Sequence, residues 1–376
     1  MNQLKHDPEM ICIGCGATLQ SDDETKAGFL PASLLKNANA NEDLYCKRCF
    51  RLRHYNEVQD VELTDDDFLN MLHEISDKQA LIINIVDIFD FNGSFISGIQ
   101  RFAGKNPVIL VGNKIDLLPK SLKEGKMRQW VTERAHEAGL HPKEVLLTSA
   151  MDTESVEALM KKIEIERKGQ DVYVVGTTNV GKSTLINQII KLATDTEDVI
   201  ITSYFPGTTL GKIEIPLDDE RVLVDTPGII QSSQIAHYLT PKELKQVTPR
   251  KEIKPKVYQL NQEQTLFLGG LARFDYLKGA GKQSFVCYLS NELNIHRTKL
   301  EKADQLYATQ KGELLTPPYK DNLESLPELK RFEFTVKEPS DLVFSGLGWI
   351  SIESAGTVVA GWAPKGVDIV LRKSLI

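Results

Sequence analysis

One nine-residue segment constrains the fold of this chain more than any other feature. Gly176–Thr184 reads GTTNVGKST, which fits the pattern GxxxxGK[ST] of a phosphate-binding loop. The segment follows the apolar run VYVV and precedes the helical run LINQIIKLA, the strand–loop–helix context that the pattern requires. A chance glycine-rich turn would not bring this context with it. We therefore predict a nucleotide-binding α/β domain.

The residues of this loop have separate expected roles. Backbone N–H groups of the curled loop and the N-terminus of the following helix would face phosphate oxygens. The ammonium of Lys182 would reach the β- and γ-phosphates, and the hydroxyl of Ser183 would bind Mg²⁺. The other loop residues expected to contact the nucleotide are Gly176, Asn179, Val180, Gly181 and Thr184.

Two later segments complete a magnesium and γ-phosphate site. Val222–Gly228 reads VLVDTPG, an apolar strand that ends in DxxG. Asp225 would hold Mg²⁺ through water, and the amide of Gly228 would sense the γ-phosphate. Between the two motifs lies PGTT at 206–209, where we expect Thr209 to complete Mg²⁺ coordination when GTP is bound. Taken alone, these four residues fit an ordinary turn better.

Guanine recognition is predicted from two segments that come earlier in the chain. NKID at 113–116 follows the strand-like run VILVG, and the carboxylate of Asp116 would accept hydrogen bonds from guanine N1–H and the 2-amino group. Adenine lacks that pattern. TSA at 148–150 ends another strand, where a backbone N–H would bind guanine O6. The expected guanine site comprises Asn113, Lys114, Asp116, Ser149 and Ala150.

The order of these motifs is unusual. Ordinary GTPases run from P-loop through switch threonine and DxxG to NKxD and SA, whereas here NKID and TSA come first. A parallel sheet permits this, because ligands bind at the carboxyl ends of strands whatever the chain order. We predict a circularly permuted P-loop GTPase domain with a six-stranded, mostly parallel sheet. Its strands are expected at Leu81–Asp87, Val108–Gly112, Val145–Thr148, Val172–Gly176, Lys212–Ile215 and Arg221–Asp225, and its helices include Ser121–Ala138 and an Asp-capped Asp152–Arg167.

Four of the five cysteines form two CxxC pairs. Cys12 and Cys15 are separated by thirty residues from Cys46 and Cys49. Two such knuckles close a tetrahedral Zn²⁺ site, and the long spacing favours a treble-clef-like finger. Buried free cysteines or a redox pair remain alternatives. His54 is an alternative ligand, although with four cysteines present it fits better on the basic surface of the run 47–54.

The chain divides into three regions that differ in composition and sequence pattern. We expect a zinc-finger module at 1–60, the permuted G domain at 61–240 and a β-rich α+β domain at 241–376, with a Lys- and Pro-rich linker at 241–256 and one helix near Thr298–Thr309. The net charge of −7 argues against indiscriminate nucleic-acid coating. Residues 240–376 nevertheless hold 20 basic and 16 acidic residues, which permits RNA contact. A targeting signal or membrane span is not indicated, so we expect a cytoplasmic protein without membrane or DNA partners.

The combined pattern resembles the circularly permuted GTPases, and within them the YqeH family. The resemblance covers the CxxC pairs, the order NKID–TSA–GTTNVGKST–PGTT–DTPG and a C-terminal extension, and the run VDIFDFNGS at 86–94 is similar as well. It implies a role in assembly of the bacterial small ribosomal subunit, with the 30S particle or its precursor as partner. GTP, GDP, Mg²⁺ and Zn²⁺ are the expected ligands.

Catalysis is expected to be slow. Ile229 follows DxxG where many GTPases place the glutamine that orients water. Asn179 resembles the asparagine of GTPases that bind K⁺ beside the phosphates, although a purely loop-stabilising role fits equally. The expected catalytic set is Lys182, Thr209, Gly228 and Asn179. A molecular switch is favoured over a nucleotide-dependent RNA-modifying or metabolic enzyme, because residues 241–376 carry no catalytic or cofactor motif.

Overall fold

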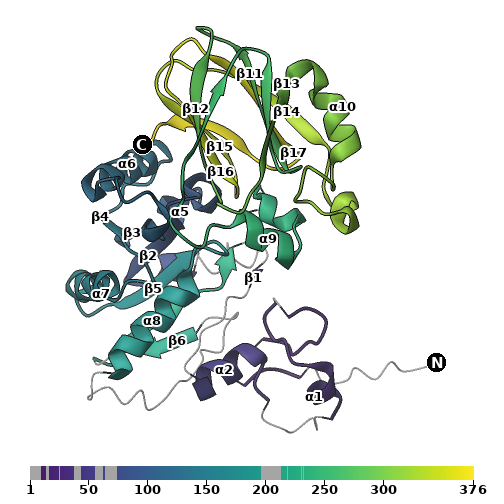
Figure 1. Ribbon diagram of the computed structural model, residues 1–376. Coiled ribbons are helices and arrows are strands. Elements are labelled where there is room, and N and C mark those ends of the chain that lie inside the picture. The colour runs from purple at the N-terminus through teal and green to yellow at the C-terminus, as the bar shows by residue number, and fades with distance from the viewer. Residues whose placement is uncertain are drawn as a thin grey trace. The chain divides into compact units, whose positions relative to one another are not determined.

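The computed structural model describes residues 10–13, 17–24, 26–37, 44–55, 62–63, 74–195, 213–217, 219–229, 231 and 233–376. Contacts divide the chain into two compact units (Figure 1). One comprises residues 1–88, 94–115 and 131–230, and the other comprises residues 89–93, 116–130 and 231–376.

The first unit is built around a six-stranded sheet with the strand order β4-β3-β2-β5-β7-β6. All neighbouring strands are parallel except β6, which runs antiparallel to β7. The predicted mostly parallel sheet is therefore confirmed. The strands are β2 (Ala80–Asp87), β3 (Val108–Asn113), β4 (Glu144–Leu147), β5 (Asp171–Gly176), β6 (Ile213–Pro216) and β7 (Val222–Asp225).

Helices cover this sheet and bury its strands. Every residue of β2 and β3 is buried, which explains why both strands read as continuous apolar runs. Helices α7 (Thr153–Arg167) and α8 (Lys182–Asp195) lie together on one face (Figure 1), where their apolar side chains pack on β2 and β5. The chain also forms α4 (Phe91–Ser94), α5 (Ile99–Ala103) and α6 (Glu124–Glu137). Asp152 occupies the expected N-cap of α7, but its carboxylate makes no capping hydrogen bond.

The N-terminal segment forms a small module with its own core. It contains α1 (Ala32–Asn37) and α2 (Lys47–Tyr55), and three cysteines are buried with Leu19 and Leu30. After it, β1 (Glu62–Leu63) pairs in parallel with β8 (Gly228–Ile229).

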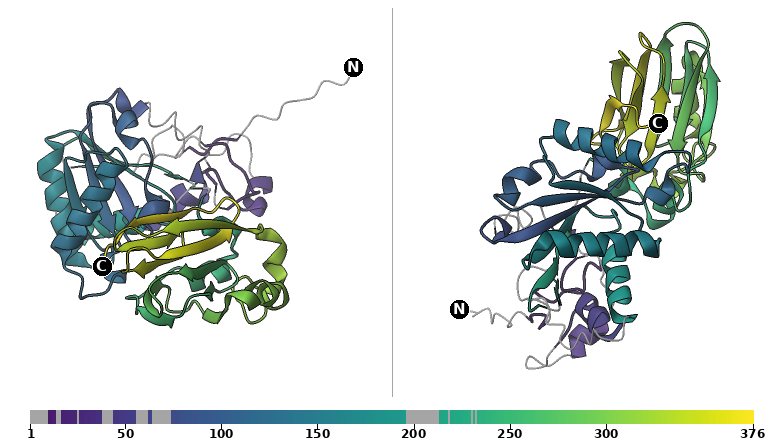
Figure 2. Two further views of the ribbon diagram at one scale, coloured as in Figure 1. Left: turned by 90° about the horizontal axis from the view of Figure 1, so that it is seen from above. Right: turned by 90° about the vertical axis from the view of Figure 1, so that its left-hand side faces the viewer.

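The second unit is a sandwich of two antiparallel five-stranded sheets, which Figure 2 shows face to face. Their strand orders are β13-β10-β11-β17-β14 and β18-β15-β16-β12-β9, and inward-facing apolar residues of both sheets form one core. The β-rich prediction is confirmed, and the expected helix is α10 (Leu300–Gln310). The strands are β9 (Lys256–Leu260), β10 (Gln264–Leu268), β11 (Ala272–Lys278), β12 (Gln283–Leu289), β13 (Ile295–Lys299), β14 (Leu329–Thr335), β15 (Ser340–Phe344), β16 (Gly348–Ile352), β17 (Val358–Pro364) and β18 (Ile369–Lys373).

Strands β15 and β16 form a hairpin, in which Gly346 turns the chain with φ 83°. One detail of this unit differs from the sequence-based expectation. The expected linker 241–256 contains α9 (Pro241–Val247), which begins with a capping box between Thr240 and Glu243. Short 3₁₀ helices lie at η1 (Ile115–Leu117), η2 (Ile235–Tyr238) and η3 (Lys320–Ser325). Among the described residues, no helix has the length and apolarity needed to cross a membrane.

Candidate nucleotide and metal sites

The sheet topology gathers the motifs at one edge. Strands β3, β5 and β7 are all parallel to β2 or to its neighbour, so their carboxyl ends lie on the same side of the sheet. The NKID segment follows β3, the P-loop follows β5, and Asp225 ends β7. The order of the strands in the sheet therefore brings the motifs together, although their order along the chain is permuted. They lie at the edge of the sheet where α/β proteins bind ligands.

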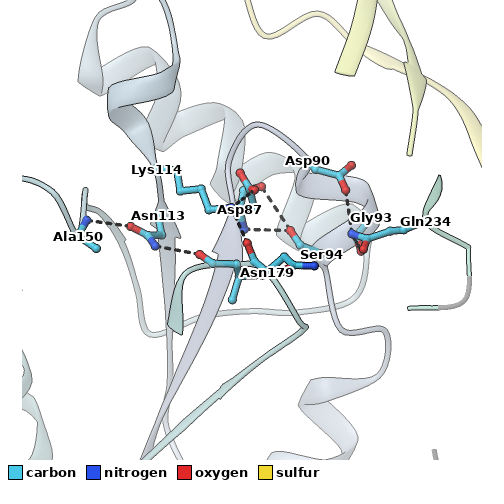
Figure 3. Close-up of polar contacts among 10 residues, drawn as sticks. Asp87, Asp90, Gly93, Ser94, Asn113, Lys114, Ala150, Asn179 and Gln234 are labelled. Atoms are coloured by element: carbon cyan, nitrogen blue, oxygen red, sulfur yellow. Dashed lines mark hydrogen bonds and ion pairs between the residues drawn. The ribbon is translucent and has the colours of Figure 1, made fainter. Parts of the chain in front are cut away.

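Asn113 joins three of the motifs (Figure 3). Its buried side-chain amide donates to the carbonyl of Val180 in the P-loop at 2.9 Å and accepts from the backbone N–H of Ala150 at 3.2 Å. The P-loop can approach because residue 181 is glycine: a Cβ there would lie 2.7 Å from the Asn113 amide nitrogen, and φ is 86°. One side chain thus fixes the NKID, P-loop and TSA segments relative to one another.

Lys114 makes a second set of contacts between segments at this edge of the sheet. Its ammonium donates to the carboxylate of Asp87, at 2.6 Å, and to the carbonyl of Asn179 (Figure 3). Ser94 in turn accepts the backbone N–H of Asp87 at 3.0 Å. Sequence reasoning did not identify Asp87 as a site residue, although it lies within the VDIFDFNGS run at the end of a buried strand.

The expected guanine contacts are placed only in part. Asp116 lies in η1, directly after the NKID lysine and isoleucine. In the TSA segment, the N–H of Ser149 donates to the hydroxyl of Ser155 at 3.1 Å, and that of Ala150 donates to Asn113. Both amides are thus engaged within the protein, and the hydrogen bond to guanine O6 stays a prediction.

Asp225 ends β7 beside the P-loop lysine, and its side chain is fully buried. One carboxylate oxygen accepts from the ammonium of Lys182 at 2.5 Å, and the other accepts from the guanidinium of Arg48 at 2.8 Å. Thr226 anchors the DxxG loop by donating its hydroxyl to the carbonyl of Val174 at 2.8 Å. Arg48 was expected on the basic surface of the N-terminal module, and its burial corrects that expectation.

The oxygen donors fit a magnesium ion. Ser183 is buried in the first turn of α8, beside Lys182, and Asp225 faces the P-loop lysine. Hydroxyl and carboxylate oxygens are ligands that Mg²⁺ prefers, usually together with water and phosphate oxygens. Thr209 and the whole segment 206–209 lie outside the described residues. Ile229 is buried in β8 and offers no polar group to a water molecule.

The N-terminal cysteines form a second candidate metal site. The sulfur atoms of Cys12, Cys46 and Cys49 lie within 4.8 Å of one another, and all three residues are buried. The backbone N–H of Cys46 donates to the sulfur of Cys12 at 3.1 Å. This arrangement is compatible with tetrahedral thiolate coordination of a zinc ion. Cys15 and the side chain of His54 lie outside the described residues.

Comparison with known proteins decides the family. A family model described as "YqeH-like, C-terminal" matches residues 282–375, and one described as "50S ribosome-binding GTPase" matches residues 171–262. The protein YqeH of Bacillus subtilis (strain 168) is 55% identical over 98% of this chain and 100% of its own length. The chain belongs to the YqeH family. It is therefore a GTPase that uses GTP or GDP with Mg²⁺.

More distant relatives of this YqeH-family GTPase carry other names. NO-associated protein 1, chloroplastic/mitochondrial, of Arabidopsis thaliana is 34% identical, and the match covers 91% of this chain and 69% of that protein. Nitric oxide-associated protein 1 of Mus musculus is 25% identical, with 98% and 75% covered. The GTPase family model begins at β5, so NKID and TSA precede its match, as permutation requires.

Proposed function

We propose that this GTPase is a nucleotide-controlled switch in assembly of the small ribosomal subunit, and that it binds the 30S particle or a precursor through rRNA or ribosomal proteins. One observation carries the proposal. The segment that follows DxxG is hydrogen-bonded into the C-terminal β-sandwich: the N–H of Asp368 donates to the carbonyl of Ser233 at 3.1 Å, and the N–H of Ile235 donates to Ser345 at 3.2 Å.

The same segment also contacts the loop after β2. The side-chain amide of Gln234 donates to the carboxylate of Asp90 at 2.8 Å and to the carbonyl of Gly93 at 2.7 Å (Figure 3). In GTPases, the segment after DxxG is the one that responds to the γ-phosphate, through its glycine amide. A change at Gly228 would therefore be passed along the chain to residues that the β-sandwich holds.

Surface charge supports an RNA-containing partner. The sandwich exposes Lys278, Lys282, Lys330, Lys337 and Lys365, and residues 240–376 have a surplus of four basic residues. Arg273 does not contribute, because it is buried and paired with Asp275 and Asp304. Basic side chains that neutralise phosphates give binding that weakens as salt rises.

Co-sedimentation tests the ribosomal partner directly. Purified protein is centrifuged with 30S particles in a non-hydrolysable GTP analogue and in GDP, at low and high salt. We expect association that depends on the nucleotide and weakens with salt. A double charge reversal at Arg51 and Arg53 on α2 should reduce it by roughly tenfold, as for loss of two phosphate contacts, without changing GTP affinity. Lys161→Glu, an exposed change on α7, is the matched control.

No association in either nucleotide, at low salt and micromolar protein, would contradict the ribosomal part of the proposal. Equal loss in the Lys161→Glu control would show that bulk charge, rather than α2, governs binding.

We also propose the residue roles within the site. Asp116 reads guanine, the P-loop residues bind phosphates, and Ser183, Asp225 and Thr209 serve Mg²⁺. The buried Ile229 supports slow intrinsic hydrolysis, since it cannot orient water. Asn179 lies in the P-loop with φ 64°, and the exposure of this residue is consistent with cation binding by its side chain.

Potassium dependence tests the role of Asn179. Hydrolysis should be about tenfold faster in K⁺ than in Na⁺, the factor that 1.4 kcal/mol of transition-state stabilisation gives. Asn179→Ala should abolish the difference between the two salts. Equal rates in both salts for the wild type would instead favour the loop-stabilising role.

A further inference from the structure

Both oxygens of the DxxG aspartate are held by cationic side chains. Lys182 takes Oδ1 and Arg48 takes Oδ2, and the three side chains are at most 5% exposed. The P-loop lysine is expected near this carboxylate. The arginine is not, since it comes from a position 177 residues earlier in the chain.

Arg48 belongs to the cysteine module. It lies in the first turn of α2, between Cys46 and Cys49, two of the three clustered cysteines. Burying a guanidinium and a carboxylate costs desolvation free energy that their attraction only roughly offsets. A buried ion pair is therefore weak evidence for stability, and a switching or positioning role is the better explanation for it.

A second contact joins the same two regions. β1, which follows the cysteine module in the chain, pairs with β8, with Glu62 opposite Gly228 and Leu63 opposite Ile229. Strand β8 contains Gly228, the glycine expected to sense the γ-phosphate. Its backbone thus pairs with β1, the strand that follows the cysteine module. The cysteine module and the strand that follows it therefore contact the DxxG segment at both its aspartate and its glycine.

We propose that Arg48 and Mg²⁺ are alternative occupants of Asp225. The inference rests on the proposed nucleotide site. Mg²⁺ keeps an ordered shell of water, and a carboxylate that serves the ion must accept hydrogen bonds from that shell. Oδ2 of Asp225 is engaged by Arg48, and a divalent cation that joins a buried carboxylate already paired with Lys182 and Arg48 is repelled strongly by both at low dielectric. Arrival of Mg²⁺ with GTP therefore displaces Arg48 and releases α2 of the cysteine module.

A magnesium titration tests this competition. Binding of a fluorescent, non-hydrolysable GTP analogue is followed as Mg²⁺ is added to wild type, Arg48→Ala, Arg48→Lys and Lys47→Ala. In Arg48→Ala the Mg²⁺ concentration for half-maximal binding should fall about fivefold or more, a common size for coupling between two ligands. Arg48→Lys should stay near wild type. Lys47→Ala removes a neighbouring charge that pairs with Glu24, and it should change nothing.

The outcomes separate the competing explanations. An unchanged magnesium requirement in Arg48→Ala overturns the proposal, as does a weaker affinity for the Mg²⁺–analogue complex, which would make Arg48 an assisting rather than a competing group. No analogue binding by the wild type would instead refute the proposed nucleotide site.

A second measurement uses only the wild-type chain. Amide hydrogen exchange across residues 44–55 should become faster when Mg²⁺ and the analogue are both present, and stay slow with the analogue in buffer that contains no added Mg²⁺ and no chelator. Exchange that is equally slow in both conditions would show that α2 is not released, whatever the variants do.

Discussion

Single polar side chains hold this site together. Asn113 connects three motifs, Lys114 connects β2 with the P-loop, and Asp225 pairs with two cations. Each makes several hydrogen bonds while buried or half-buried, so removing one partner leaves another group unsatisfied at a cost of roughly 1–3 kcal/mol. The geometry of this edge is therefore largely fixed by contacts within the protein.

Base specificity is tested at Asp116. In Asp116→Asn, the carboxylate that accepts from guanine N1–H and the 2-amino group becomes an amide. Affinity for GTP should fall by roughly a hundredfold or more, as expected for loss of two charge-assisted hydrogen bonds. Affinity for xanthosine triphosphate should rise, because xanthine offers an acceptor where guanine offers a donor. Competition titrations with GTP, xanthosine triphosphate and ATP measure both changes.

Asp152→Asn serves as the control, since that aspartate makes no capping hydrogen bond. If the wild type binds ATP as tightly as GTP, the guanine-reading role of Asp116 is wrong.

For single residues, the sequence predicted the chemical role of a side chain better than it predicted whether that side chain is buried. The types and spacings of the motif residues indicate their roles, because phosphate and guanine recognition need those groups in that pattern. Burial of basic residues followed no such rule. Arg48 stands in the basic run 47–54, which was expected at the surface, yet it is buried against Asp225, and Arg273 is likewise buried against Asp275. Arg273 also lies 4.7 Å from the Trp362 ring, a long-range contact that local sequence does not encode.

Secondary-structure elements were predicted where one local signal dominates. The buried parallel strands appear as apolar runs, and their boundaries agree with expectation within about two residues. Helix α9 was missed because its lysines and prolines suggest a linker, although Thr240-Pro241 with Glu243 is a helix-start signal. The carboxylate of Glu243 in this cap also accepts hydrogen bonds from the N–H of Tyr319 and from the side chain of Asn322. Burial alone would raise the pKa of Glu243, but the hydrogen bonds hold this pKa below its ordinary value.

Metal removal is tested at the scale of the N-terminal module. We expect one Zn²⁺ per chain, with Cys15 as the fourth ligand beside the three clustered cysteines. A chelator should unfold the module, because the buried core of its described residues is small and consists of the three cysteines, Leu19 and Leu30. Elemental analysis and hydrogen exchange across residues 44–55 measure the ion and the loss of protection.

Cys12→Ser should lose the metal, whereas Cys287→Ala should keep it, since Cys287 is buried in the β-sandwich core. Protein purified without chelator that contains no zinc would contradict the assignment. If Arg48 leaves Asp225 when the module unfolds, chelation should also lower the Mg²⁺ requirement for nucleotide, as Arg48→Ala does.

At the scale of the whole molecule, the circular permutation changes which part of the chain follows the nucleotide-sensing DxxG segment. In the usual motif order, NKxD and SA segments follow DxxG in the chain. Here the chain runs from DxxG directly into the segment 231–238, which hydrogen-bonds to β-sandwich residues. The sequence could predict this connection, because it depends only on motif order. The individual hydrogen bonds were not predictable, since they join residues more than a hundred positions apart.

This coupling can be tested at the turn of the β15–β16 hairpin. A Cβ at Gly346 would lie 2.9 Å from the Ile235 side chain and 3.3 Å from its backbone nitrogen, so Gly346→Ala should push Ile235 away and break its hydrogen bond to Ser345. Gly356→Ala is a matched control: φ is 80° there against 83° at Gly346, but nothing lies within 4 Å of the added Cβ. Both variants should lose about 1 kcal/mol of stability from backbone strain.

Only Gly346→Ala should uncouple the β-sandwich from the nucleotide. In the wild type and in Gly356→Ala, hydrogen exchange in residues 340–352 should differ between the GTP analogue and GDP, because the segment after DxxG is hydrogen-bonded to that hairpin. In Gly346→Ala the difference should disappear while analogue affinity stays unchanged, since Gly346 lies outside the motifs that bind nucleotide. If both variants keep the difference, the bond between Ile235 and Ser345 does not transmit the state of the nucleotide, and if both lose it, backbone strain in the sandwich is sufficient to explain the loss.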